Sequence, residues 1–150
     1  MKNIHNIKDN ALNIGACYKI GEVTNYENLV KLFFSPQGRE FCTKHNFPTI
    51  EQFRQIKDKV KPYKVFVDAG EIEAYNQSHI AIIGNTHAKI KMHGVDELYH
   101  VIVMHGATAT IEVEHYAVAH IVNISGGDVA IYNDKTTKVH YEHQSERSNR

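Results

Sequence analysis

The chain has 150 residues, 42% of them hydrophobic, with 17 basic and 17 acidic side chains and a formal net charge of zero. A chain of this length is expected to form one domain with a buried core. The charge balance argues against a protein that holds nucleic acid mainly by neutralising phosphates, because such binding needs a clustered excess of basic residues.

The chain has two cysteines, Cys17 and Cys42, and no CxxC pair of the kind found in zinc and redox sites. A disulfide between them stays open, but two buried free thiols in a reducing cytosol are favoured. No segment has the apolar length of a membrane span, and the first ten residues lack the apolar core of a signal peptide. We therefore expect a cytoplasmic protein without membrane contacts.

Residues 1–63 have apolar side chains at helical spacing, separated by helix-start signals. Thr24–Glu27 and Thr49–Gln52 have the spacing of capping boxes, and Ser35 followed by Pro36 predicts another helix start. Residues 11–18 form either a helix or an irregular arm, and we assign no role to residues 1–24. The side chains expected to face the core are Leu29, Val30, Leu32, Phe33, Phe34, Phe41, Cys42, Ile50, Phe53, Ile56 and Val60.

From Lys64 onward the pattern changes to period two, with glycines between apolar segments. When the glycines are aligned, four segments correspond, and they begin at residues 64, 78, 100 and 120. The intervals are therefore 14, 22 and 20 residues, and His140 follows after another 20. This repeat predicts a solenoid whose first turn is incomplete.

Matching columns of apolar residues support the repeat. Ile90, Ile111 and Ile131 recur after 21 and 20 residues, with Ala88, Ala109 and Val129 two positions earlier in each turn. The first strands give two more columns in the glycine alignment, namely Phe66, Ile80, Ile102 and Val122, and Asp68, Ile82, Met104 and Ile124. A parallel solenoid needs such columns, because each turn buries its inner face only together with the turns beside it.

The charged residues of the second strands alternate in sign from turn to turn. They are Glu71 and Glu73, then Lys89 and Lys91, then Glu112 and Glu114. Parallel in-register stacking places opposite charges within cross-strand reach. Glu71 and Glu73 also lie close to Asp68 in the sequence, and these three carboxylates could act in acid–base chemistry. The charge ladder explains Glu71 and Glu73 better.

Together these patterns predict an α+β chain. A helical N-terminal cap, residues 1–63, precedes a short single-stranded parallel β-solenoid of about three rungs, residues 64–150, and both form one folding unit. The usual preference of parallel crossovers predicts a right-handed coil. The polar segment from Val139 to Arg150 is expected to be a frayed tail.

Histidine is over-represented, with eleven in the chain and nine of these from residue 79 onward. We expect His100, His120 and His140 to stack in one column. A sequence repeat of twenty residues produces such a column even where it has no function. If a metal site exists, His105 and His115 are its candidate ligands, brought together at the subunit seams of a trimer. We expect no cofactor and no catalytic residue.

Two further motifs have structural explanations. Residues 125–128, Ser-Gly-Gly-Asp, lack the P-loop pattern and are expected to form a tight corner. The lysines at 57, 59, 61 and 64 could contact a nucleic acid, but they are better explained as the solvated C-terminal end of a helix.

Four segments, Asn25–Cys42, Asn46–Thr49, Ile83–Thr86 and Val103–Ile111, resemble recurring segments of proteins from gut Bacteroidales and their mobile elements. This resemblance extends from about residue 25 to residue 130. It implies that the helices and the solenoid occur as a unit, and it implies no activity.

The expected function is a non-enzymatic interaction module that presents a rigid solenoid face to a protein or polymer. Its expected contact residues are Lys89, Lys91, Glu112, Glu114 and Tyr132. A trimeric β-helix enzyme with an interfacial histidine metal site and a homo-oligomeric, phage-particle-like component remain as alternatives.

Overall fold

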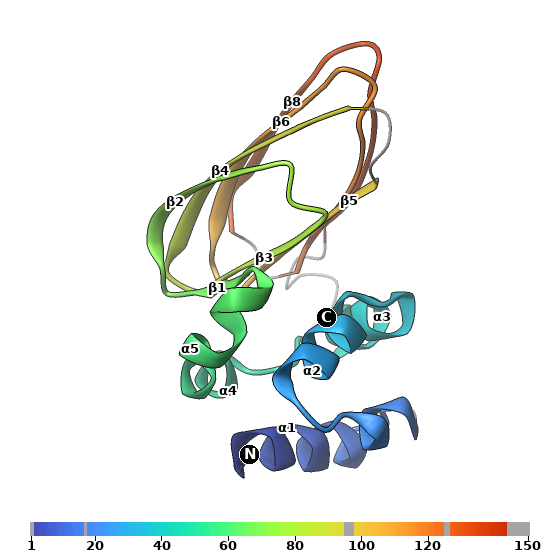
Figure 1. Ribbon diagram of the computed structural model, residues 1–150, viewed down its shortest axis with the longest axis vertical. Coiled ribbons are helices and arrows are strands. Elements are labelled where there is room, and N and C mark those ends of the chain that lie inside the picture. The colour runs from blue at the N-terminus through green and yellow to red at the C-terminus, as the bar shows by residue number, and fades with distance from the viewer. Residues whose placement is uncertain (1, 17, 95–97, 125–126, 144–150) are drawn as a thin grey trace, which may run out of the picture. The chain divides into compact units, whose positions relative to one another are not determined.

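The structure is a computed structural model that describes residues 2–16, 18–94, 98–124 and 127–143 (Figure 1). Contacts divide the chain into two compact units, Met1–Val65 and Phe66–Arg150. The first unit is helical, and the second is built from parallel strands. The predicted α+β class, with helices at the N-terminus followed by a parallel β-solenoid, is confirmed. The capping role of residues 1–63 and the hand of the coil stay predictions.

The first unit contains five α-helices and two 3₁₀ turns among its described residues. They are α1 (Lys2–Asn13), η1 (Tyr18–Glu22), α2 (Tyr26–Phe34), α3 (Pro36–His45), α4 (Ile50–Gln55), α5 (Lys57–Val60) and η2 (Lys61–Tyr63). Of the segment 11–18, residues 11–13 belong to α1, residues 14 and 15 form a turn, and Tyr18 begins η1, so the helix covers only the first part. Ile4, Ile7 and Ala11 explain this helix, because they lie three or four residues apart and are all buried.

The predicted helix starts are right in two cases and displaced in one. Ser35 caps α3, with Pro36 at its first position, and Thr49 forms a complete capping box with Gln52. The cap of α2 is Asn25 rather than Thr24, because the Asn25 side chain accepts the hydrogen bond from the Asn28 N–H at 2.8 Å. An asparagine oxygen caps as well as a threonine hydroxyl, so spacing alone could not choose between these neighbours.

The apolar face predicted for residues 50–60 belongs to two short helices. Phe53, Ile56 and Val60 are buried as expected, but the backbone leaves the helical region at Ile56, where φ is −113°. Cys42 is a buried free thiol whose pKa is raised to about 12 by burial, which makes it unreactive. Cys17 lies outside the described residues.

The second unit coils two parallel sheets into a solenoid of about four turns. The five-stranded sheet has the order β1-β3-β5-β7-β9, and the four-stranded sheet has the order β2-β4-β6-β8. The strands are β1 (Val65–Val67), β2 (Gly70–Tyr75), β3 (His79–Ile83), β4 (Thr86–His93), β5 (Leu98–Met104), β6 (Thr108–Glu114), β7 (Val118–Asn123), β8 (Val129–Asn133) and β9 (Lys138–His143). Figure 1 shows them as successive loops of one coil.

The coil has about one turn more than predicted. The strand β9 pairs with β7 over six residues, whereas the sequence predicted a frayed tail from Val139. Polar side chains do not prevent pairing at a sheet edge, where one face needs no burial. Residues 144–150 lie outside the described part of the chain.

The register of the second strands agrees with the prediction. Ile90 pairs with Ile111 and Ile111 with Ile131, and the column of Ala88, Ala109 and Val129 is also present. These side chains belong to the solenoid core or pack against it, together with Ile80, Val101 and Ile121 from the other sheet.

The glycine alignment of the first strands is right between β5 and β7, where His100 pairs with His120, but it is wrong by one residue between β3 and β5. His79 pairs with His100, so Ile80 faces Val101, and Ala81 rather than Ile80 faces Ile102. The reason lies in the turn after each strand. Gly84 and His105 both follow the paired residues Ile83 and Met104, and both have positive φ, 66° and 57°. The equivalent of Gly84 is therefore His105, and Gly106 comes one position later.

Candidate functional site

The residues predicted as a contact face all lie on the outward side of the four-stranded sheet. Lys89 and Lys91 are in β4, Glu112 and Glu114 are in β6, and Tyr132 is in β8. They alternate with core side chains, so they point away from the core. We call the outward side chains of this sheet the ladder face: Glu71, Glu73, Tyr75, His87, Lys89, Lys91, His93, Thr108, Thr110, Glu112, Glu114, Ala130 and Tyr132.

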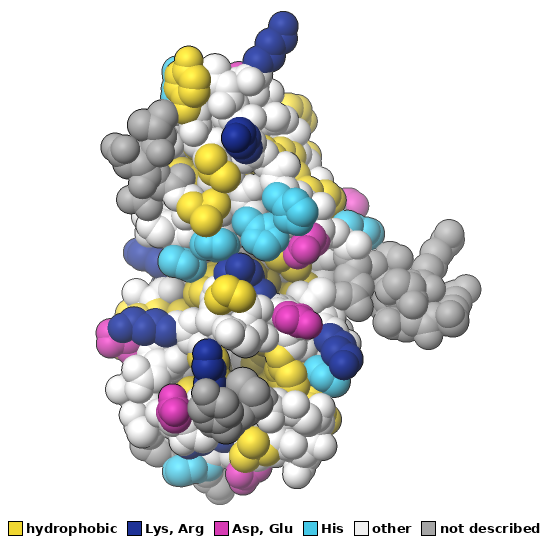
Figure 2. Space-filling model, turned by 90° about the vertical axis from the view of Figure 1, so that its right-hand side faces the viewer, with side chains coloured by type: hydrophobic (Ala, Val, Ile, Leu, Met, Phe, Trp, Pro, Cys, Tyr) yellow, Lys and Arg dark blue, Asp and Glu magenta, His cyan; other side chains and the backbone are white. Residues whose placement is uncertain are grey.

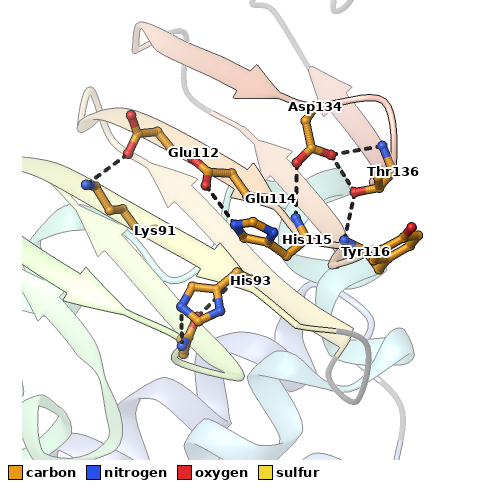
Figure 3. Close-up of polar contacts among 9 residues, drawn as sticks. Lys91, His93, Glu112, Glu114, His115, Tyr116, Asp134 and Thr136 are labelled. Carbon is orange, nitrogen blue, oxygen red and sulfur yellow. Dashed lines mark hydrogen bonds and ion pairs between the residues drawn. The ribbon is translucent and has the colours of Figure 1, made fainter.

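The predicted alternation of charge is present in two pairs. Lys91 Nζ lies 3.4 Å from Glu112 Oε2 (Figure 3), and Glu73 is the register partner of Lys89. The hydrogen bond and charge of Glu112 hold the pKa of Lys91 above its usual range. Glu114 faces His93 instead of a lysine, because β4 ends with a histidine at that register. The face therefore carries charges of both signs in fixed positions.

A hollow of about 600 Å³ lies on the ladder face. Its polar lining combines carboxylates, a lysine, an imidazole and two hydroxyl groups, at Glu71, Glu73, His87, Lys89, Thr108, Thr110 and Asp128. Small side chains such as Ala130 leave room for it. Three of its residues, Glu73, Lys89 and Thr110, form one register column, so the hollow extends across adjacent turns.

Two exposed tyrosines lie in the column beside the hollow. This column reads Tyr75, Lys91, Glu112 and Tyr132 in the order of the strands β2, β4, β6 and β8. Tyr75 is 56% exposed and Tyr132 is 61% exposed. A ring with a hydroxyl group offers large contact area at low entropic cost, and for this reason tyrosine is frequent in binding surfaces.

At the corner that follows β6, polar side chains of the next turn hold the backbone (Figure 3). Asp134 accepts hydrogen bonds from the backbone N–H of His115 at 3.1 Å and from the backbone N–H of Thr136 at 2.9 Å. The Thr136 hydroxyl also donates to Asp134, and it accepts from the Tyr116 N–H at 2.8 Å. These hydrogen bonds, that of the Thr136 hydroxyl first, hold the pKa of Asp134 below its usual range. Asn76 accepts a similar bond from the His93 N–H.

The candidate metal ligands His105 and His115 are not neighbours within one chain. His105 precedes β6 and His115 follows it, and the seven residues of this strand span roughly 20 Å at the usual rise. His115 is instead close to Glu114, with 3.5 Å between Nε2 and Oε2. A site containing both imidazoles would need a second subunit, as the trimer hypothesis assumes.

The predicted histidine column is present on the five-stranded sheet, and it has one member more than the glycine alignment allowed. His79, His100, His120 and His140 are register partners in β3, β5, β7 and β9. Their successive ring centroids are 5.2, 5.8 and 4.9 Å apart. Figure 2 shows histidine side chains gathered in a row across one face, with an acidic side chain beside them.

Sequence reasoning missed Glu142 as a partner of this column. Its carboxylate lies 3.3 Å from His120 Nε2 and 3.5 Å from His140 Nε2. The ligand atoms of these three residues lie within 4.8 Å of one another. The signal was the spacing His140-x-Glu142, since alternate residues of a strand share a face, but the segment was expected to be a tail.

The remaining motifs have local structural roles. Asp68 accepts a hydrogen bond from the Asn85 N–H at 2.8 Å, so it stabilises the turn before β4. Ser125 and Gly126 lie outside the described residues. A Cβ at Gly127 would lie 1.9 Å from the carbonyl oxygen of Ala107, which agrees with the predicted tight corner. The basic segment has Lys57 and Lys59 in α5 and Lys61 in η2, at the end of the helices as expected.

Comparisons with protein-family models, with curated proteins and with solved structures found no match for this chain. None of the helices in the described ranges is both long enough and apolar enough to cross a membrane.

Proposed function

We propose that the protein is a non-enzymatic interaction module that binds a protein or polymer partner on the ladder face. The observation that carries the proposal is the hollow of about 600 Å³, which combines charged, hydroxyl and imidazole side chains on one rigid sheet. Binding sites for extended partners are shallow and need several polar groups in fixed positions. The hollow offers such groups on adjacent turns.

The rigidity of the sheet supports the proposal. The outward side chains are anchored by core residues of the same strands, such as Ile90 and Ile111, which are 1% and 0% exposed. A preorganised face loses little conformational entropy when a partner binds. The Lys91–Glu112 ion pair places charges of both signs in the column beside the hollow.

The chemistry of the ladder face favours a partner with both charged and hydrogen-bonding groups. Glu73 and Lys89 present opposite charges side by side, and Thr110 continues the same column. Tyr75 and Tyr132 add apolar contact area in the next column. A partner with a single sign of charge, such as a nucleic acid backbone, would meet a carboxylate at nearly every lysine.

The test is a comparison of binding between the wild type and two double variants. Immobilised full-length protein is used to capture partners from the cell of origin and from arrays of polysaccharides and peptides, and each partner is then titrated. The face variant Lys89→Ala/Tyr132→Ala should bind at least about tenfold more weakly, since central tyrosine truncations often cost more than 1 kcal/mol. The control variant Glu27→Ala/Lys31→Ala removes an exposed ion pair on α2 and should bind like the wild type.

Equal affinity of the face variant and the control for every captured partner would contradict the proposal. Chemical change of the bound polymer would favour an enzyme. A wild-type oligomer that the face variant converts to monomers would identify the partner as a second copy of this chain.

A further inference from the structure

The histidine column on the five-stranded sheet places one imidazole on the same spot in every turn from β3 to β9. In-register parallel strands lie about 4.8 Å apart, and they bring identical side chains together at nearly that separation. His120 lies between two other imidazoles of the column. Its ring centroid is 4.9 Å from that of His140 and 5.8 Å from that of His100. This end of the column therefore has two imidazoles that can share one small ligand.

Glu142 adds an oxygen ligand at the same end. It lies two residues after His140 on β9, so both side chains point to the same side of the strand. One carboxylate oxygen is 3.3 Å from His120 Nε2, and the other is 3.5 Å from His140 Nε2. In a tetrahedral zinc site with bonds of about 2.0–2.1 Å, neighbouring ligand atoms are roughly 3.3 Å apart. The separation between His120 and one carboxylate oxygen already has this value, and that between His140 and the other oxygen is 0.2 Å longer.

Burial and position favour a site at this point of the sheet. The His120 side chain is only 22% exposed, which limits its rotation, while His140 is 70% exposed and leaves the site open to solvent. The strand β9 is the edge of the five-stranded sheet, and its pairing with β7 fixes the distance between the two histidines. The three ligand atoms lie within 4.8 Å of one another, so binding one ion requires the exposed side chains of His140 and Glu142 to move closer to His120.

We infer that His120, His140 and Glu142 bind one divalent transition-metal ion of the zinc type. Two imidazoles and a carboxylate are ligands that zinc accepts, and three protein ligands leave the fourth tetrahedral position for water or another ligand. The ion would join the edge strand β9 to β7 and so stabilise the last turn of the solenoid. This site differs from the ladder face and from His105 and His115.

A simpler interpretation of the same geometry is a pair of ion pairs, in which Glu142 accepts hydrogen bonds from protonated imidazoles. The two interpretations differ in their pH dependence. Protonated histidines strengthen the ion pairs as the pH falls, whereas metal binding needs neutral imidazoles and weakens. A measurement with added metal at two pH values therefore separates them.

The experiment uses the full chain without a histidine tag, stripped with a chelator and titrated with Zn²⁺ at pH 7.5 against a chromophoric competitor. We expect one equivalent bound with a dissociation constant in the micromolar range or below. The variants His140→Ala and Glu142→Gln should each bind at least about a hundredfold more weakly, since the loss of outer-shell groups alone costs 10–100-fold. Both side chains are solvent-accessible, and circular dichroism checks that the variants fold.

Two histidine variants serve as controls. His143→Ala removes an imidazole from the same strand but from the opposite side, and His115→Ala removes the ligand suggested by the sequence. Both should bind zinc like the wild type. Zinc should also slow amide hydrogen exchange in β9 of the wild type at pH 7.5, and this effect should weaken at pH 5.5.

The inference is overturned if the wild type binds no zinc at one equivalent, or if His140→Ala and Glu142→Gln bind as tightly as the wild type. Loss of binding in His115→Ala, with binding kept in His140→Ala, would also overturn it and would move the site to the other corner. These outcomes are independent of partner binding on the ladder face, which the variants Lys89→Ala and Tyr132→Ala test.

Discussion

The two sheets of the solenoid share one core but differ in their outward faces. On the four-stranded sheet, outward residues such as Lys89 and Thr110 are exposed, and they alternate strictly with buried ones. On the five-stranded sheet, the strands β3, β5 and β7 each carry one outward histidine, and the outward residues that follow this histidine along the strand are buried. The latter are Ala81, Ile83, Ile102, Met104, Val122 and Ile124.

This difference shows that the same repeat can form two kinds of surface. Strands buried on both faces have continuous apolar sequences, whereas strands with one wet face alternate. Segments such as Ile80–Ile83 and Val101–Met104 belong to the first kind, and Thr86–His93 belongs to the second. Partner binding is therefore proposed for the alternating sheet, and the metal site for the polar edge of the other.

The largest change in the free energy of unfolding is expected for a substitution on the outward side of the five-stranded sheet, which is buried. Ile102 points away from the solenoid core but is only 1% exposed, so Ile102→Ala should lower the free energy of unfolding by about 2–5 kcal/mol. Thr110→Ala, at an exposed outward position of the four-stranded sheet, should stay within about 0.5 kcal/mol of the wild type. Urea unfolding measures both. Equal, small effects would mean that both outward faces are solvated.

An intermediate effect is expected at the corner of the four-stranded sheet. The hydrogen bonds to Asp134 lower its pKa, so this carboxylate stabilises the folded state above the unfolded pKa and the contribution is lost as the pH falls through the lower folded pKa. Asp134→Ala should therefore be less stable than the wild type at pH 7, and the two should converge below about pH 4.

Thermal unfolding of both proteins between pH 2.5 and 7 checks this prediction. Thr136→Ala provides a second test, since the Thr136 hydroxyl is the strongest cause of the lowered pKa and its loss should reduce the pH dependence. A stability difference that is the same at every pH would assign the effect of Asp134→Ala to lost packing instead of lost charge.

The smallest effect concerns the ion pair on the ladder face. Lys91 and Glu112 are both solvent-accessible, and exposed ion pairs add little because water screens them. A double-mutant cycle of Lys91→Ala and Glu112→Ala should give a coupling that changes Tm by no more than about 2 °C and disappears in 1 M salt. A larger coupling that persists in salt would show that this face is less solvated than the alternation indicates.

The sequence by itself determined the repeat and most of the local structure. The column of Ile90, Ile111 and Ile131 follows from period two and a turn of about twenty residues, and both can be counted along the chain. The caps at Ser35 and Thr49 also depend only on neighbouring residues. Such features are predictable because each depends on local geometry or on a repeated spacing.

Only the tertiary structure decided the register between β3 and β5 and the partner of the histidine column. His79 aligns with His100 because His105 adopts the positive φ that Gly84 also adopts, and the sequence does not show that a histidine replaces a glycine there. Glu142 meets His120 because the polar segment after Val139 pairs as an edge strand. Both results depend on which segments pair across turns, and this choice is made by the whole sheet.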